Sequence, residues 1–216
     1  MKGCDITCGV GAVSIPDQQK ELAQTAGKFS IYKMTNVQVQ STGNKIRNCT
    51  AMDGAIFKFD RTEFTDDGSI FEYNGADRGG VAFCTSCKMT FKNSIFKGNY
   101  AKKGGIFYIE NWGELILENV QIFSSRAFEA GGLVYAEGQK TDLETKGVTN
   151  YVGAAPTVNY VKYVKITIQQ VAQPDPLLPQ PPLDFKSFES LQNGAAVFIK
   201  NGELNVNDMV IDLVES

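Results

Sequence analysis

Apolar residues recur at alternate positions in short runs along much of the chain, which is the pattern of β-strands. Met89 and Phe91 form one such pair, and Leu115 and Leu117 form another. The sequence shows no sustained pattern of apolar residues at i, i+3 and i+4, which would indicate a helix. We therefore expect an all-β protein.

The runs belong to a repeat of about 26 residues, marked by a pair of small residues before an apolar run. The copies align on the second member of each pair: Gly54, Gly80, Gly105, Gly132 and Ala195. The first four are 26, 25 and 27 residues apart, whereas 63 residues separate the last two. A unit this short must stack on its neighbours to bury its apolar face. The repeat predicts a right-handed parallel β-helix, a solenoid of about six coils with one large insertion.

The spacing divides the chain into four segments. Residues 1–24 form an N-terminal segment or first partial coil, 25–137 form coils, 138–192 form the insertion, and 193–216 form the final coil. Inside the insertion, the alternating run Val158–Ile168 is predicted to be a coil strand. The proline-rich segment Gln173–Pro182 is expected to loop out along the surface, because proline disfavours a central strand.

Asparagine recurs at two fixed places in the repeat. One set consists of Asn36, Asn93, Asn119 and Asn207. The other stands six residues before the second small residue and consists of Asn48, Asn74 and Asn99. Stacked coils place equivalent side chains about 4.8 Å apart, so amides can bond along the stack and satisfy buried turn backbone. We interpret both sets as structural ladders rather than as catalytic residues.

The glycine-pair segments and the segment Phe96-Lys97-Gly98-Asn99 resemble the two short motifs of polymorphic outer membrane protein repeats. The same pattern is similar to large repeat-rich surface proteins of protists. The resemblance covers roughly residues 25–137 and 193–212. It implies a pectin-lyase-like β-helix at the cell surface or outside the cell, used in adhesion or assembly. Because those families have many more coils, we expect this chain to be one segment of a larger molecule.

The strand after each small pair is apolar on both faces, so one face needs an explanation. The alignment places one aromatic residue per coil in a single row: Phe57, Phe83, Tyr108, Tyr135 and Phe198. An exposed apolar surface of this extent usually marks an interface. The insertion could cover the row, another protein chain or a second copy could bind it, or the rings could form a carbohydrate platform. We predict that this row is an interface for other chains.

Charge and hydropathy exclude two classes of partner. The net charge of −3 and the pI near 5.1 disfavour nucleic-acid binding, which requires a dense basic patch. No stretch reaches the roughly 18 apolar residues of a membrane span. The first residues do not resemble a signal peptide, because Asp5 interrupts the apolar stretch that a signal peptide requires.

The acidic residues Asp60, Glu63, Asp66 and Asp67 are the one candidate for catalysis or Ca²⁺ binding, and we place them in a single loop. Charges in a turn are usually just solvated, and the chain has no histidine. We therefore predict no catalytic residue, no metal and no cofactor. The alternative is a polysaccharide lyase or hydrolase, or a carbohydrate-binding β-helix.

The five cysteines leave three interpretations open. Cys4 and Cys8, with Cys84 and Cys87, could together hold zinc, or a disulfide could form within either pair. Free buried or turn cysteines are the default expectation, with Cys49 as the fifth.

Overall fold

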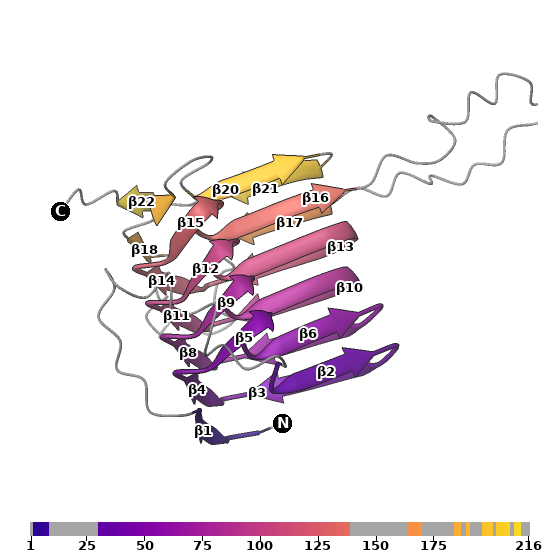
Figure 1. Cartoon of the computed structure of the whole chain (residues 1–216), viewed down its shortest axis with the longest axis vertical. Coiled ribbons are helices and arrows are strands. Elements are labelled where there is room, and N and C mark those ends of the chain that lie inside the picture. The colour runs from indigo at the N-terminus through magenta and orange to yellow at the C-terminus, as the bar shows by residue number, and fades with distance from the viewer. Residues whose placement is uncertain are drawn as a thin grey trace, which may run out of the picture.

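The computed structural model describes residues 2–8, 30–138, 164–169, 184–186, 189–190, 196–200, 202–207 and 210–212. These residues form an all-β parallel solenoid of about four turns. Figure 1 shows the strands stacked in order along the long axis, from β1 to β20 and β21. The prediction of a stacked parallel β-solenoid is thus confirmed.

Three parallel sheets form the walls of the solenoid. Sheet A contains β2 (Tyr32–Thr35), β3 (Gln38–Thr42), β6 (Phe57–Asp60), β7 (Glu63–Asp67), β10 (Ala82–Lys92), β13 (Phe107–Glu118), β16 (Val134–Gly138), β17 (Val164–Gln169), β20 (Val197–Lys200) and β21 (Gly202–Asn207). Sheet B contains β1 (Asp5–Thr7), β4 (Lys45–Arg47), β8 (Ile70–Glu72), β11 (Ile95–Lys97), β14 (Gln121–Phe123), β18 (Asp184–Lys186) and β22 (Val210–Asp212). Sheet C contains β5 (Thr50–Asp53), β9 (Gly75–Arg78), β12 (Tyr100–Lys103), β15 (Arg126–Ala130) and β19 (Glu189–Ser190).

Between residues 32 and 131, each coil runs through sheets A, B and C in turn and leaves each sheet through a residue with positive φ. From sheet C back to sheet A this residue is always glycine: Gly54, Gly79, Gly104 and Gly131. A Cβ at Gly79 would lie 2.1 Å from the Ala82 carbonyl oxygen, so glycine is required there by space as well as by φ. These glycines fix where each coil begins.

The glycine turns correct the alignment made from sequence spacing. Gly54 N–H donates to the Arg78 carbonyl and Gly79 N–H to the Lys103 carbonyl, so Gly54 is equivalent to Gly79. The sequence alignment had matched Gly54 with Gly80. The equivalent of Gly80 is Ala55, and the first coil was therefore aligned one residue out of register. A shift of one residue exchanges the two faces of a strand.

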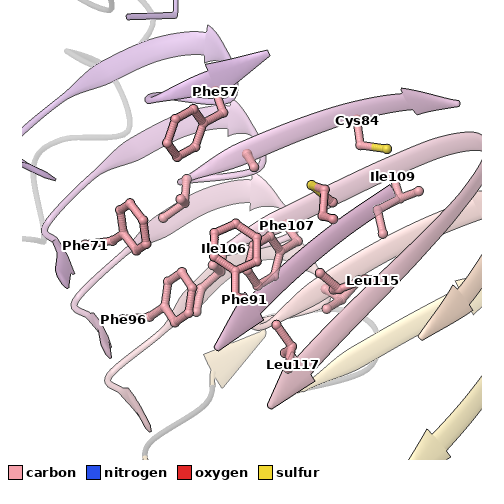
Figure 2. Close-up of a cluster of buried hydrophobic side chains, with 14 of the residues drawn as sticks. Phe57, Phe71, Cys84, Phe91, Phe96, Ile106, Phe107, Ile109, Leu115 and Leu117 are labelled. Atoms are coloured by element: carbon pink, nitrogen blue, oxygen red, sulfur yellow. The ribbon is translucent and has the colours of Figure 1, made fainter. Parts of the chain in front are cut away.

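The interior is lined mainly by phenylalanine and aliphatic side chains. Figure 2 shows Phe57, Phe71, Phe91, Phe96 and Phe107 gathered between the sheets, and all five are fully buried. The Phe71 and Phe96 rings, one coil apart, stack with centroids 5.1 Å apart. The inward position of sheet C is alanine in four successive strands: Ala51, Ala76, Ala101 and Ala127. Small residues on this wall leave room for the rings from the other two.

The described residues of the predicted insertion include three strands of the solenoid, β17, β18 and β19. β17 pairs with β13 and β21, β18 pairs with β14 and β22, and β19 pairs with β15, all in parallel. The alternating run Val158–Ile168 thus includes a coil strand in its described part, residues 164–168. The segment Gln173–Pro182 lies outside the described residues.

Candidate functional site

An aromatic ladder runs along the outer face of sheet A. It consists of Phe83, Tyr108, Tyr135 and Phe198, which occupy equivalent positions in β10, β13, β16 and β20. Successive ring centroids are 5.3, 5.0 and 4.8 Å apart, and the planes differ by about 10°. Each ring face inside the ladder is therefore covered by the next ring.

Phe57 does not belong to this ladder, so its prediction as an interface residue is wrong. Phe57 pairs with Ala82 and lies inside the solenoid, where it is fully buried (Figure 2). Lys58 pairs with Phe83 and occupies the ladder position in that coil. The one-residue error at Gly54 explains the misassignment, because it moves the inward side chain to the outer row.

Side chains from the end of sheet C cover the ladder, which the sequence alone did not reveal. The Arg78 guanidinium lies 4.5 Å from the Phe83 centroid and 5.4 Å from that of Tyr108. The Lys103 ammonium lies 5.2 Å from the Tyr135 centroid. As a result Phe83, Tyr108 and Tyr135 are only 2%, 7% and 8% exposed. The predicted row is present from Phe83 onward, but it is not an open apolar surface.

Charged groups around the ladder are paired with each other. Asp53 accepts hydrogen bonds of 2.7 Å from both Arg78 Nε and Lys58 Nζ. Burial acts to raise the pKa of Asp53, and the two basic partners outweigh it, so the pKa of this carboxyl is lowered. Burial and the nearby Glu137 carboxylate raise the pKa of Tyr135 to about 12. The phenol therefore stays protonated and donates to Glu137 Oε2 at 3.3 Å.

Two of the predicted ladder asparagines form a buried chain of hydrogen bonds at the turn from sheet B to sheet C. Asn74 Oδ1 accepts the Cys49 N–H at 3.1 Å, and Asn99 Oδ1 accepts the Asn74 N–H at 3.0 Å. Asn74 Nδ2 donates to the Ile46 carbonyl and to Asn99 Oδ1. Each side chain thus satisfies backbone groups in a neighbouring coil.

Asn48 lies one position earlier in this turn and does not share the position of Asn74. It has φ of 56° and is equivalent to Tyr73, whose φ is 55°. The residue aligned with Asn74 is Cys49. The same one-residue error at Gly54 accounts for this correction.

The other asparagine set divides in the same way. Asn93 and Asn119 share a turn position, and Asn119 Nδ2 donates to Asn93 Oδ1 at 3.4 Å. Asn36 instead occupies the bend between β2 and β3, where it is equivalent to Arg61. Asn207 is the last residue of β21 and pairs with Gln169, one position before the turn. The expected ladder of four therefore contains two members among the described residues.

The acidic residues predicted to share a loop are spread over two strands and two faces. Asp60 ends β6 and pairs with Arg61, whereas Glu63, Asp66 and Asp67 lie in β7. Asp66 points into the solenoid and is fully buried. Its carboxylate accepts hydrogen bonds from Ser69 and Ser94 at 2.6 and 2.8 Å. These hydrogen bonds order a turn. The four acidic residues do not direct two carboxylates toward one common position, as acid–base catalysis on a substrate would require.

Four of the five cysteines form disulfides, Cys8–Cys49 and Cys84–Cys87, and Cys4 is free and exposed. The zinc alternative is therefore wrong, because disulfide sulfurs are not thiolate ligands. The default expectation of free cysteines is wrong for these four residues. Cys84–Cys87 is one of the two disulfides that the sequence left open, whereas Cys4 and Cys8 are not joined to each other. In the described ranges no three His, Cys, Asp or Glu side chains are grouped as a metal ion requires.

At the C-terminal edge of sheet A, two side chains in otherwise buried rows are exposed. Leu204 and Val206 of β21 pair with Ile166 and Ile168, which are fully buried. Leu204 and Val206 themselves are 43% and 42% exposed. Their pairing with Ile166 and Ile168 places both side chains on the inward face of the sheet. No described strand pairs with the other edge of β21. We call Phe198, Lys200, Glu203, Leu204 and Val206 the C-terminal edge.

Comparisons of the chain with models of protein families, with curated proteins and with solved structures gave no match. Among the described residues there is no helix able to cross a membrane.

Proposed function

We propose that this protein is a non-catalytic structural module whose solenoid is continued by another protein chain in a larger assembly. The observation behind the proposal is the C-terminal edge. Leu204 and Val206 belong to rows that are fully buried one coil earlier, and nothing described covers them. Interior side chains left in water cost free energy in proportion to their apolar area, and a further coil would recover it.

The outer surface supports a structural role over the carbohydrate-acting alternative. A sugar platform needs an open ring face, and the faces of Tyr108 and Tyr135 are taken by neighbouring rings and by Arg78 and Lys103. Basic and acidic side chains pair between adjacent coils, as in Lys88–Glu114 and Lys92–Glu118. These groups stabilise the stack and are not directed into a common groove.

We infer further that the stack is a right-handed, pectin-lyase-like β-helix of about six coils. Crossovers between parallel strands are right-handed in nearly all proteins. The main path of sheet A passes through β2, β6, β10, β13, β16 and β20, one strand for each coil.

A cell-surface or extracellular location fits the cysteines. Disulfides persist in oxidising compartments and are rare in the cytosol. Cys8–Cys49 and Cys84–Cys87 together use four of the five cysteines. The two disulfides support our proposal that the assembly forms outside the reducing cytosol.

Site-specific photo-cross-linking tests the proposal. A benzophenone amino acid replaces Leu204 in one variant and Tyr73 in a control, because Tyr73 is 47% exposed on a turn far from the edge. After irradiation in cells of the source organism, the Leu204 variant is expected to give an adduct of defined mass and the control none. Equal labelling at both positions, or none at Leu204, would overturn the proposal.

A further inference from the structure

We propose that the C-terminal edge binds a parallel β-strand of a partner protein that has a defined pattern of side chains. The strand offers an aromatic or basic residue opposite Phe198, an acidic residue opposite Lys200, a basic residue opposite Glu203, and apolar residues opposite Leu204 and Val206. This inference rests on the proposed function and names the chemistry of the partner.

The backbone of the edge defines the direction of the added strand. β17 pairs with β21, and β16 with β20, in parallel and without a bulge. A strand adds to a free sheet edge through main-chain hydrogen bonds, and its alternate side chains confer specificity. The two inward positions next to Leu204 and Val206 require apolar side chains, because the preceding pairs, Leu115–Ile166 and Leu117–Ile168, are fully buried.

The charge of the residue opposite Glu203 follows from a row that alternates in sign. Successive coils place Glu63, Lys88, Glu114, Lys165 and Glu203 at equivalent positions. Lys88 and Glu114 form an ion pair of 3.1 Å. Like charges directly opposite each other in a sheet are destabilising. The next member of the row is therefore basic.

Lys200 and Phe198 extend two further rows. Glu110, Glu137 and Lys200 are equivalent in successive coils, and Lys200 Nζ donates to Glu137 Oε1 at 2.7 Å. An acidic residue on the other side of Lys200 would pair with it as Glu137 does, because opposite charges on neighbouring strands stabilise a sheet. At the other end of the aromatic ladder, the Lys58 ammonium covers Phe83 at 5.2 Å from the ring centroid. An aromatic or basic residue on Phe198 would cover this end in the same way.

A second copy of the chain fits this edge poorly. Its N-terminal strands in sheet A, β2 and β3, would place Thr35 opposite Lys200 and Gln38 opposite Glu203, and neither residue is charged. In addition, sheet B extends one strand further than sheet A at that end, because β1 lies beyond β4. In a stacked second copy, its β1 would contact β22 of the first copy and would keep its β2 from reaching β20 of the first copy. The proposed strand therefore differs in sequence from β2 and β3.

A peptide copied from this protein provides the probe. The segment Phe83–Lys92 has Phe83, Lys88, Met89 and Phe91 at the required spacing. Thr85→Glu supplies the acidic residue, and serine replaces Cys84 and Cys87. The control peptide also has Lys88→Glu. Each peptide carries a terminal fluorophore, and binding to the full chain is measured by fluorescence anisotropy.

The lysine peptide is expected to bind about two- to fivefold more tightly than the control, which is the range for one surface charge pair in a sheet. Glu203→Lys is expected to reverse the preference, and Glu203→Gln to abolish it. Val206→Asp, checked for folding by circular dichroism, should weaken both peptides tenfold or more. A peptide preference that does not follow the charge at residue 203 overturns the partner chemistry proposed here. In that case, a cross-linked adduct at residue 204 would still support the proposed function.

Sedimentation velocity of the chain alone provides the last test. We expect a species that does not self-associate through this edge. A concentration-dependent dimer that Val206→Asp abolishes would identify a second copy as the occupant and overturn this proposal.

Discussion

The Arg78 guanidinium lies over the Phe83 ring, 4.5 Å from its centroid, while Arg78 Nε donates to Asp53 Oδ1 at 2.7 Å. Arg78 ends one coil and Phe83 begins the next, and the turn at Gly79 brings them face to face. Arg78 thus links two neighbouring coils. It forms an ion pair with Asp53 in the preceding coil and covers the Phe83 ring in the following coil.

Replacing Arg78 with alanine is expected to lower the free energy of unfolding by about 1–3 kcal/mol, because a cation–π contact and a charged hydrogen bond are lost together. Urea unfolding measures the change. Lys88→Ala is the control, since Lys88 pairs with Glu114 and, among the described residues, lies over no aromatic ring, and it should cost at most about 1 kcal/mol. Equal effects of the two substitutions would show that the ring contact contributes nothing.

Gly105→Ala is expected to destabilise the solenoid by about 1–3 kcal/mol or more. A Cβ at Gly105 would lie 2.1 Å from the Gly132 carbonyl oxygen and 2.6 Å from that of Arg126, and backbone atoms cannot move aside cheaply. Gly68→Ala is the matched control, because its Cβ meets nothing within 4 Å and only its positive φ opposes the change. If Gly105→Ala unfolded at the same urea concentration as Gly68→Ala, the close approach of the coils would be refuted.

Asp66→Asn is expected to be at least as stable as the natural protein at pH 7. Burial raises the pKa of Asp66 above its usual 3.8, against the hydrogen bonds from the serines around it. The Asp66 carboxyl therefore binds its proton more tightly in the folded protein than in the unfolded chain. Its contribution to the free energy of unfolding falls as the pH rises from 3.8 through the folded-state pKa. The difference between the two proteins should disappear below pH 3.8, as urea unfolding across this range would show. A deficit for Asp66→Asn that is constant with pH would contradict the assignment.

A thiol reagent is expected to label one cysteine per chain, both before and after denaturation without reductant. Cys4 is free and exposed, and the other four cysteines are joined in pairs. Cys4→Ser should abolish the labelling, and a count of three or five would contradict the pairing.

Removing Cys8–Cys49 by double serine substitution should cost about 4 kcal/mol in urea unfolding, against about 2 kcal/mol for Cys84–Cys87. The first joins residues 41 apart in sequence and the second residues 3 apart, so the first restricts the unfolded chain more. Equal losses from the two double variants would contradict this loop-length account.

The sequence spacing was sufficient for the solenoid but not for its register. Alternating strands, small pairs and a period near 26 residues predicted stacked parallel coils, because a short unit has few other ways to bury its apolar face. The coil boundary depends on which glycine has positive φ. Ala55 occupies the position that is glycine in the next coils, so spacing alone matched Gly54 with the wrong partner. Phe57 and Asn48 were misplaced for this single reason.

The cover of the aromatic ladder was not predictable from the pattern of apolar residues. Arg78 and Lys103 precede the glycine turns and look like ordinary exposed charges in the sequence. Only the fold of the turn shows that their side chains reach back over Phe83 and Tyr135. Similarly, Asp66 looked like part of a charged loop, and its place inside the solenoid depends on the register of β7.

The alternating row from Glu63 to Glu203 determines how this solenoid can grow by gene duplication. Duplicating a single coil would set glutamate against glutamate or lysine against lysine at the new junction. Duplicating two adjacent coils would keep every neighbour opposite in sign. Adding coils in even numbers therefore preserves the alternating charges of this row, whereas adding an odd number does not.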